Sequence, residues 1–134
     1  MPREIRAVES PKLVKPVKPY YKPAVMVKGG KLLFISGVPP FDPNGNLIGK
    51  GDIKAQTKQI IENMKRILEE AGGSLDDIVC VTVYLTDIRY FEDVAEVRLQ
   101  YFRNANMAST LVEVSKLYHP DQLIEISAIA VLKD

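Results

Sequence analysis

Apolar residues recur at helical spacing along one long stretch of the chain. Asp52 is a suitable N-cap for it, and Gly72-Gly73 supplies a stop signal. The apolar stripe between these points consists of Ile53, Thr57, Ile60, Ile61, Met64, Ile67, Leu68 and Ala71. A shorter stripe follows Asp87, a second suitable cap, and consists of Phe91, Val94, Val97, Tyr101 and Phe102. These patterns predict two amphipathic helices.

Stretches rich in β-branched residues alternate with these helices and predict strands. They cover residues 24–27, 32–36, 78–86, 110–117 and 123–132. Gly29-Gly30 forms a turn between the first two, and the N-terminal arm offers one further edge strand. The resulting order, β-β-α-β-α-β-β, predicts an α+β protein in which two helices cover one face of a sheet.

The predicted strands 78–86 and 123–132 are largely apolar on both of their sides. Val79, Val81, Val83 and Leu85 share one side of the first strand, but the other side also carries Ile78, Cys80 and Tyr84. A face without helices would expose apolar surface to water, at a cost of about 25 cal/mol per Å². We therefore expect a homo-oligomer that buries this second face.

Length and composition fit a single globular domain. The chain has 134 residues, 46% of them apolar, and its longest apolar run is far below the roughly 20 residues of a membrane span. The N-terminal residues have no apolar segment typical of a signal peptide. Cys80 is the one cysteine, so no internal disulfide is expected. These features predict a cytoplasmic protein with no membrane partner.

Charge is distributed unevenly. Residues 1–30 hold seven Lys/Arg and two Asp/Glu, whereas the rest of the chain holds eleven and fifteen. Prolines are frequent in the same region, so we interpret residues 1–18 as a basic, extended, proline-rich arm that precedes a single domain at 19–134. A solvated arm is the plain interpretation, and contact with RNA is the alternative.

Several blocks of the sequence resemble one known family in the same order. They are Tyr21–Val25 (YKPAV), Leu33–Pro39 (LFISGVP), Gly51–Gly72, Leu75–Asp87 (LDDIVCVTVYLTD), Val112–Leu117 (VEVSKL) and Ile124–Ala130 (IEISAIA). The chain thus resembles, over about residues 19–132, the Rid/YjgF family of imine and enamine deaminases, also called the endoribonuclease L-PSP family.

The resemblance implies a chorismate-mutase-like (YjgF-like) fold, with a mixed sheet of about six strands and two helices on one face. It also implies a homotrimer that binds a small-molecule ligand in the clefts between subunits. The implied activity is the hydrolytic deamination of reactive enamines and imines, as performed by 2-iminobutanoate/2-iminopropanoate deaminases. Neither a metal nor an organic cofactor takes part in that chemistry.

The resemblance also assigns site residues. Glu125 matches the catalytic glutamate that activates the attacking water. Its place among apolar neighbours fits, because a carboxylate is costly to bury unless it is hydrogen-bonded. The expected substrate-binding residues are Tyr21, Ser36, Gly37, Ser109, Thr110 and Leu111.

Position 109 departs from the family pattern. Active members carry there an arginine that binds the substrate carboxylate in bidentate fashion, and Ser109 cannot supply that charge or that fork. The family's pocket glutamine and helix asparagine likewise fall on Val38 and Ala95. Arg98 and Arg103, on or near the second predicted helix, are the alternative sources of a cation.

Three functions therefore compete: hydrolytic deamination with Glu125, non-catalytic binding of a small metabolite, and RNA cleavage or translational inhibition. The loss of arginine at Ser109 favours the second, and the basic arm is the local support for the third. His119 is expected to be a loop residue and Cys80 a buried small hydrophobe. We find no cluster of metal ligands in the sequence.

Overall fold

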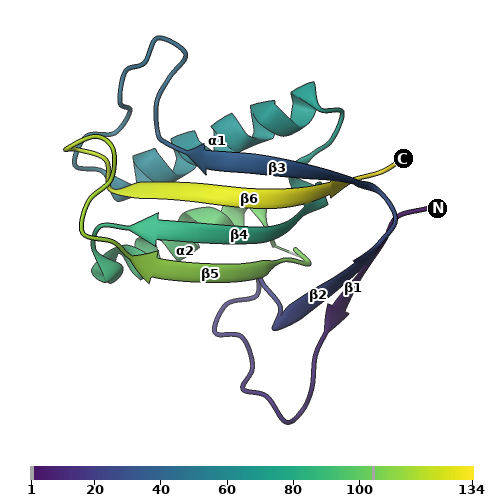
Figure 1. Ribbon diagram of the computed structural model, residues 1–134. Helices are drawn as coiled ribbons and strands as arrows, with labels where there is room; N and C mark the ends of the chain where they lie inside the picture. Colours follow the sequence, from purple (N-terminus) through teal and green to yellow (C-terminus); the bar gives the residue numbers. More distant parts are fainter. Residues whose placement is uncertain (1, 104) are drawn as a thin grey trace.

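The computed structural model describes residues 2–103 and 105–134, which form six strands, two α-helices and two short 3₁₀ helices (Figure 1). The strands are β1 (Glu4–Val8), β2 (Ala24–Lys28), β3 (Lys31–Val38), β4 (Ile78–Leu85), β5 (Ala108–Glu113) and β6 (Ile124–Leu132). The helices are α1 (Ile53–Glu70), η1 (Leu75–Asp77), η2 (Ile88–Tyr90) and α2 (Phe91–Tyr101). The expected order of elements is confirmed, and β1 is the further strand offered by the N-terminal arm.

The strands divide into two sheets instead of one. The larger has the order β3-β6-β4-β5, with β4 and β5 parallel and the other pairs antiparallel. The smaller is an antiparallel ribbon of β1 and β2. The chain turns between ribbon and sheet at Gly29 and Gly30, whose φ angles are 72° and 83°. A Cβ on Gly30 would lie 2.7 Å from the Leu132 carbonyl oxygen, so this close approach requires glycine.

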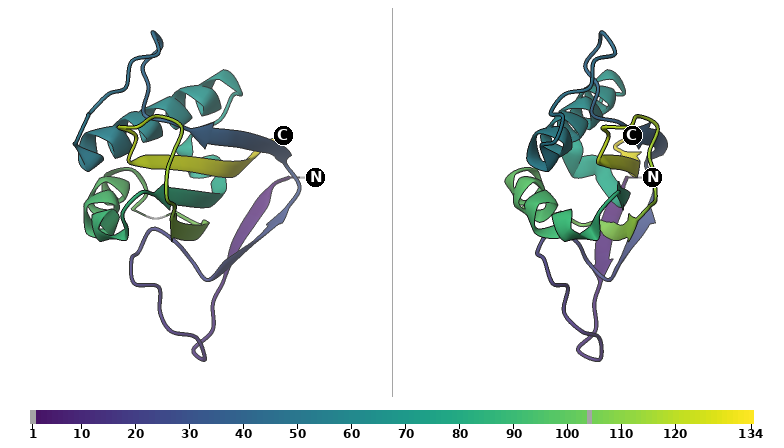
Figure 2. Two further views of the ribbon diagram at one scale, coloured as in Figure 1. Left: turned by 60° about the vertical axis from the view of Figure 1, so that its left-hand side comes forward. Right: turned by 90° about the vertical axis from the view of Figure 1, so that its left-hand side faces the viewer.

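The N-terminal segment up to residue 23, which includes the arm, contacts the rest of the chain at both of its ends. Arg3 forms an ion pair with Asp77, and its Nη1 donates to the Val131 carbonyl at 2.7 Å. Between the ribbon strands, residues 9–23 form a long loop that extends away from the large sheet (Figure 2). At the end of that loop Tyr20 is buried in the core, and the Lys22 amide donates to the Met107 carbonyl at 2.9 Å.

Helix α1 begins and ends where its sequence signals predict. Asp52 Oδ1 accepts from the Ala55 amide at 3.0 Å, and Gly72 follows the helix with a φ of 85°. The predicted stripe is buried except for Ile67, which is exposed, and Ala71, which is half-buried. A polar residue, Gln56, shares the buried side of the helix.

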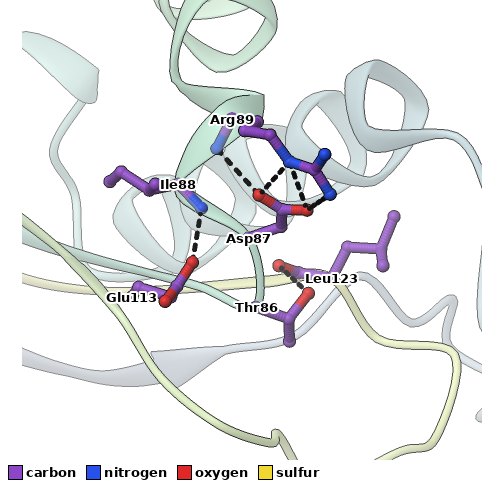
Figure 3. A network of polar contacts seen from close by, with 6 residues as sticks. All are labelled: Thr86, Asp87, Ile88, Arg89, Glu113 and Leu123. Atoms are coloured by element: carbon purple, nitrogen blue, oxygen red, sulfur yellow. Dashed lines mark hydrogen bonds and ion pairs between the residues drawn. The ribbon is translucent and has the colours of Figure 1, made fainter.

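Asp87 is a helix cap, as predicted, but it caps the short helix η2 (Figure 3). Helix α2 begins three residues further on, at Phe91. Its Oδ1 accepts from the Arg89 amide at 2.9 Å. The Ile88 amide donates to Glu113 Oε1 at 2.9 Å. Because Glu113 is the last residue of β5, this bond attaches the start of the second helical segment to the end of that strand.

Both α-helices lie on one face of the large sheet, as expected (Figures 1 and 2). Burial alternates along β4, where Val81, Val83 and Leu85 are buried against the helices while Thr82 and Tyr84 are only half-buried. We call the side opposite the helices, which carries Thr82 and Tyr84, the open face. Among the described residues, no helix is long and apolar enough to cross a membrane.

Strand β5 spans Ala108–Glu113, whereas the sequence predicted a strand over 110–117. The shift has a physical reason: β5 pairs with β4, which ends at Leu85, and the Val114 amide makes a last bond to the Leu85 carbonyl at 2.7 Å. Beyond that point the chain has no partner strand. Ser109 therefore lies within the edge strand of the sheet and has a defined facing.

Candidate functional site

Glu125 lies near the start of β6 on the open face, beside Tyr84 of β4. Its side chain is half-buried. Gln122 Nε2 donates to Glu125 Oε1 at 3.4 Å, and the other carboxylate oxygen packs against Gly37. A Cβ placed on Gly37 would lie 2.3 Å from Glu125 Oε2, so only glycine admits the carboxylate in this position.

An irregularity in β3 creates this contact. The pairing between β3 and β6 shifts between Ile35 and Val38, which places Ser36 and Gly37 at a bulge. Both residues are exposed, and Gly37 directly contacts Glu125. Gly37 and Glu125, predicted from separate parts of the sequence, are thus brought together. We call Gly37, Gln122 and Glu125 the carboxylate cluster.

Two buried glutamines support this cluster, and our sequence predictions did not include them. Gln56 Nε2 donates to the Gly49 and Asp121 carbonyls at 3.1 and 2.9 Å, and its Oε1 accepts from the Leu123 amide at 2.8 Å. Gln122 Nε2 also donates to the Ile124 carbonyl at 3.1 Å. One signal was available: Gln56 interrupts the apolar side of α1, where a buried amide needs partners.

Ser109 of β5 contacts Arg98 of α2, one of the two arginines that the sequence offered as a source of positive charge. Arg98 Nη2 donates to Ser109 Oγ at 3.1 Å, and the guanidinium lies 4.0 Å from the Tyr20 ring centroid. Arg98 is only 2% exposed, and burial lowers the pKa of its guanidinium. Burial also raises the pKa of Tyr20, an effect that the neighbouring Arg98 charge opposes. We call Tyr20, Arg98 and Ser109 the cation cluster.

The remaining predicted residues lie outside the two clusters. Tyr21 lies beside the cation cluster, with its ring centroid 5.9 Å from that of Tyr20, and it lines a hollow of about 460 Å³ within the arm. Thr110 is exposed on the open face, in register with Thr82. Leu111 is half-buried on the helix side. Arg103, the other candidate cation, is exposed.

Within one chain the two clusters do not meet. Ser109 is in register with Val81 of β4, whose side chain is buried against the helices. Glu125 is in register with Tyr84, on the open face, and β4 lies between β5 and β6. Glu125 and Ser109 are therefore two strands apart, with about 4.8 Å between neighbouring strands, and their side chains point to opposite faces of the sheet.

The open face is apolar over much of its area. Leu32 and Phe34 are 65% and 71% exposed there. A cavity of about 190 Å³ opens on it, lined by Phe34, Ile35, Cys80, Thr82, Ser127, Ala128 and Ile129. Cys80 was predicted to be buried, but it is half-buried because its side chain belongs to this uncovered face. His119 is a loop residue, as expected, and its Nδ1 accepts from the Asp121 amide at 3.0 Å.

Comparison with known proteins identifies the family. The family described as endoribonuclease L-PSP matches residues 11–132. The chain belongs to this family. Its relatives place it among the Rid/YjgF proteins of that family, as the sequence blocks indicated.

Two relatives of this endoribonuclease L-PSP family member illustrate the range. A RutC family protein of Pyrococcus abyssi is 50% identical over 119 residues, which cover 89% of this chain and 91% of that protein. The 3-aminoacrylate deaminase RutC of Acinetobacter baylyi is 36% identical over 130 residues, covering 97% and 98%.

Solved structures of the endoribonuclease L-PSP family support the fold. The Rid family protein YyfB of Yersinia pestis, of unknown function, has a TM-score of 0.87 at 29% identity and covers 96% of this chain and 98% of its own. A putative endoribonuclease of Thermotoga maritima has a TM-score of 0.72 at 41% identity, with the same coverage. The α+β fold expected from the sequence is therefore confirmed.

Proposed function

We propose that this protein hydrolyses short, reactive enamine or imine acids, with Glu125 directing the attacking water. The observation that carries the proposal is the carboxylate cluster, in which Gly37 and Gln122 hold a half-buried carboxylate on the open face. None of the ion pairs among residues 2–103 and 105–134 includes it. Such a carboxylate can accept a hydrogen bond from a water molecule. A relative 36% identical to the chain is named 3-aminoacrylate deaminase, and 3-aminoacrylate is an enamine acid of this kind.

The chemistry needs one base and one water. An enamine first becomes an imine by taking a proton on carbon while its nitrogen gives one up to solvent. Water then adds to the C=N carbon, where a C–O bond forms as the C=N π bond breaks. Glu125 accepts a proton from the water and returns it to the nitrogen. Glu125 then takes the hydroxyl proton and passes it to the nitrogen, the C–N bond breaks as the C=O bond forms, ammonia leaves, and an aldehyde or a 2-oxo acid remains, according to the substrate.

The proposed site is completed by assembly of identical chains. The exposed Leu32 and Phe34 favour burial of the open face against another copy, since exposed apolar surface of this kind marks an interface. The opposite facing of Glu125 and Ser109 has the same implication, because a cleft that contains both needs them from different chains. The family resemblance makes the proposed assembly a homotrimer.

The test supplies the unstable substrate in place. An amino-acid oxidase acting on a short amino acid releases an imino acid, and ammonia release is followed with and without the protein. We expect faster ammonia release at unchanged oxidase turnover, and sedimentation velocity should give three times the chain mass. No acceleration over buffer, with several amino-acid precursors, would refute hydrolysis.

Ser109 favours a second candidate, a trimer that binds small metabolites without converting them. Ser109 carries no charge of its own, so it cannot form the ion pair with the substrate carboxylate that an arginine forms at this position in active members of the family. This candidate predicts ligand-dependent thermal stabilisation with no ammonia release in the same assay.

The family description motivates a third candidate, cleavage of RNA. Its support in this chain is the basic N-terminal region, where Lys15 and Lys18 of the arm and the neighbouring Lys22 line the same hollow. Incubation with single-stranded RNA at low salt tests it, because phosphate contacts weaken steeply as salt rises. Intact RNA and no binding at low salt would exclude this candidate.

A further inference from the structure

Arg98 is a buried cation with no anionic partner among the described residues. Its side chain projects from α2 toward β5 and is 2% exposed. None of the ion pairs formed by the residues that the structure describes includes it. A buried charge without a counter-charge is costly, and the lowered pKa of the guanidinium reflects this cost.

The neighbours of Arg98 support the guanidinium without neutralising it. The Tyr20 ring provides an aromatic face 4.0 Å away, and the Met107 sulfur accepts at 3.7 Å. Arg98 Nη2 also donates to the Ser109 hydroxyl at 3.1 Å. The site therefore holds a positive charge in a fixed place and directs one N–H toward the edge strand.

The Ser109 hydroxyl lies between the Arg98 guanidinium and the edge of the sheet. Its Oγ accepts from Arg98, so its own proton is free to donate to a further acceptor. The residue is half-buried on β5, the edge strand of the sheet, where another molecule can approach. A hydroxyl backed by a guanidinium is a stronger donor than a lone serine, and an anion is the acceptor that it best suits.

We propose that Ser109 and Arg98 together bind the carboxylate of the substrate, with the serine hydroxyl as the donor and the buried guanidinium as the source of charge. This inference rests on the proposed function for the identity of the ligand, a short mono-acid. Ser109 makes the direct contact and Arg98 is a positioning residue behind it. The chain thus supplies from helix α2 a positive charge that its β5 sequence lacks.

The experiment measures binding of 2-oxobutanoate, the hydrolysis product of a four-carbon imino acid, to the assembled full-length protein. Arg98→Met, Arg98→Lys and Ser109→Ala are compared with Arg103→Met, a control that removes an exposed arginine five residues further along the chain. NMR titration follows the backbone amide signal of Thr110, which lies beside Ser109 on β5 and is present in every variant, and gives the dissociation constant. Butanone, which has the same carbon chain without the carboxylate, is the neutral probe.

We expect Arg98→Met and Ser109→Ala each to weaken 2-oxobutanoate binding roughly 10- to 100-fold, the loss of one charge-assisted hydrogen bond. Arg98→Lys should retain part of the affinity, and Arg103→Met all of it. Butanone binding should not change in any variant. If Arg98→Met does not fold, Ser109→Ala and Arg98→Lys carry the same comparison.

Three results would overturn the inference. They are unchanged 2-oxobutanoate affinity in Ser109→Ala and Arg98→Met, an equal loss of butanone binding, or equally tight binding of inorganic phosphate at the same signal. The outcome is separable from that of the proposed function. If the protein hydrolyses the substrate but the Arg98 variants bind 2-oxobutanoate normally, the proposed function stands and the carboxylate-binding role of Arg98 is wrong. If 2-oxobutanoate binding depends on Arg98 but no hydrolysis occurs, the binding role stands and the proposed function is wrong.

Discussion

Glu125 and Arg98 are held in contrasting ways by the same sheet. The Glu125 carboxylate is half-buried on the open face, against a glycine and one amide donor. The Arg98 guanidinium is buried on the helix side, against an aromatic ring and a hydroxyl. Two opposite charges that would neutralise each other in contact are kept apart by the sheet itself.

In the proposed function, this difference suits the two clusters to different roles. A base must exchange protons with water, and the open face leaves Glu125 accessible for that exchange. A charge that binds an anion works best where water does not screen it, and the buried position of Arg98 provides this. In the proposed assembly each chain therefore contributes one cluster to each of two sites, and a complete site requires a second copy.

The largest expected effect comes from removing the base. Glu125→Gln keeps the shape of the side chain but cannot accept the proton, so kcat should fall about 10²- to 10⁴-fold. Binding of 2-oxobutanoate should persist. Glu70→Gln, an exposed glutamate at the end of α1, is the matched control. Steady-state ammonia release checks the effect, and a loss below threefold would contradict the role of Glu125.

Gly37→Ala should have the next largest effect, about a 10- to 100-fold loss of kcat. The added Cβ would lie 2.3 Å from Glu125 Oε2, so the carboxylate must move from its position. Gly45→Ala serves as a control for backbone strain away from the site: a Cβ there meets nothing within 4 Å, but the φ of 82° disfavours alanine, so it should lower stability without changing kcat. Equal activity of Gly37→Ala and wild type would show that the contact does not orient the base.

Mixing two impaired variants tests whether a site draws on two copies. Trimers reassembled from equal amounts of Glu125→Gln and Arg98→Met chains should regain about a quarter of the wild-type rate at low substrate, because one cleft in four receives both intact residues. Neither variant alone should reach this rate. If each site used one chain only, mixing would give no more than the average of the two parents.

The smallest effect is expected at Gln122. Gln122→Ala removes the donor to Glu125 and leaves the Ile124 carbonyl without its side-chain partner, so kcat should fall a few-fold. The free energy of unfolding should drop by about 1 kcal/mol for the lost hydrogen bond. Urea unfolding and ammonia release measure the two quantities. A stability loss without any rate change would limit Gln122 to a structural role.

The sequence predicted the carboxylate cluster better than the cation cluster. Glu125 and the Ser36-Gly37 block lie in well-marked strands, whose pairing follows from alternating apolar positions. Arg98 was only one of two candidates, since nothing in the order of residues shows which arginine on a helix turns inward. Gln122 precedes Glu125 by three residues in a loop, where no periodicity indicates which way a side chain points.

The sequence by itself determined the fold class, the two helices, their shared face of the sheet and the family. These follow from periodicity, capping residues and conformational limits, which act over short distances along the chain. Only the tertiary structure decided that Arg98 contacts Ser109, that Gly37 receives the Glu125 carboxylate, and that the two clusters face opposite ways. Such contacts depend on strand order and register, which place residues far apart in sequence side by side.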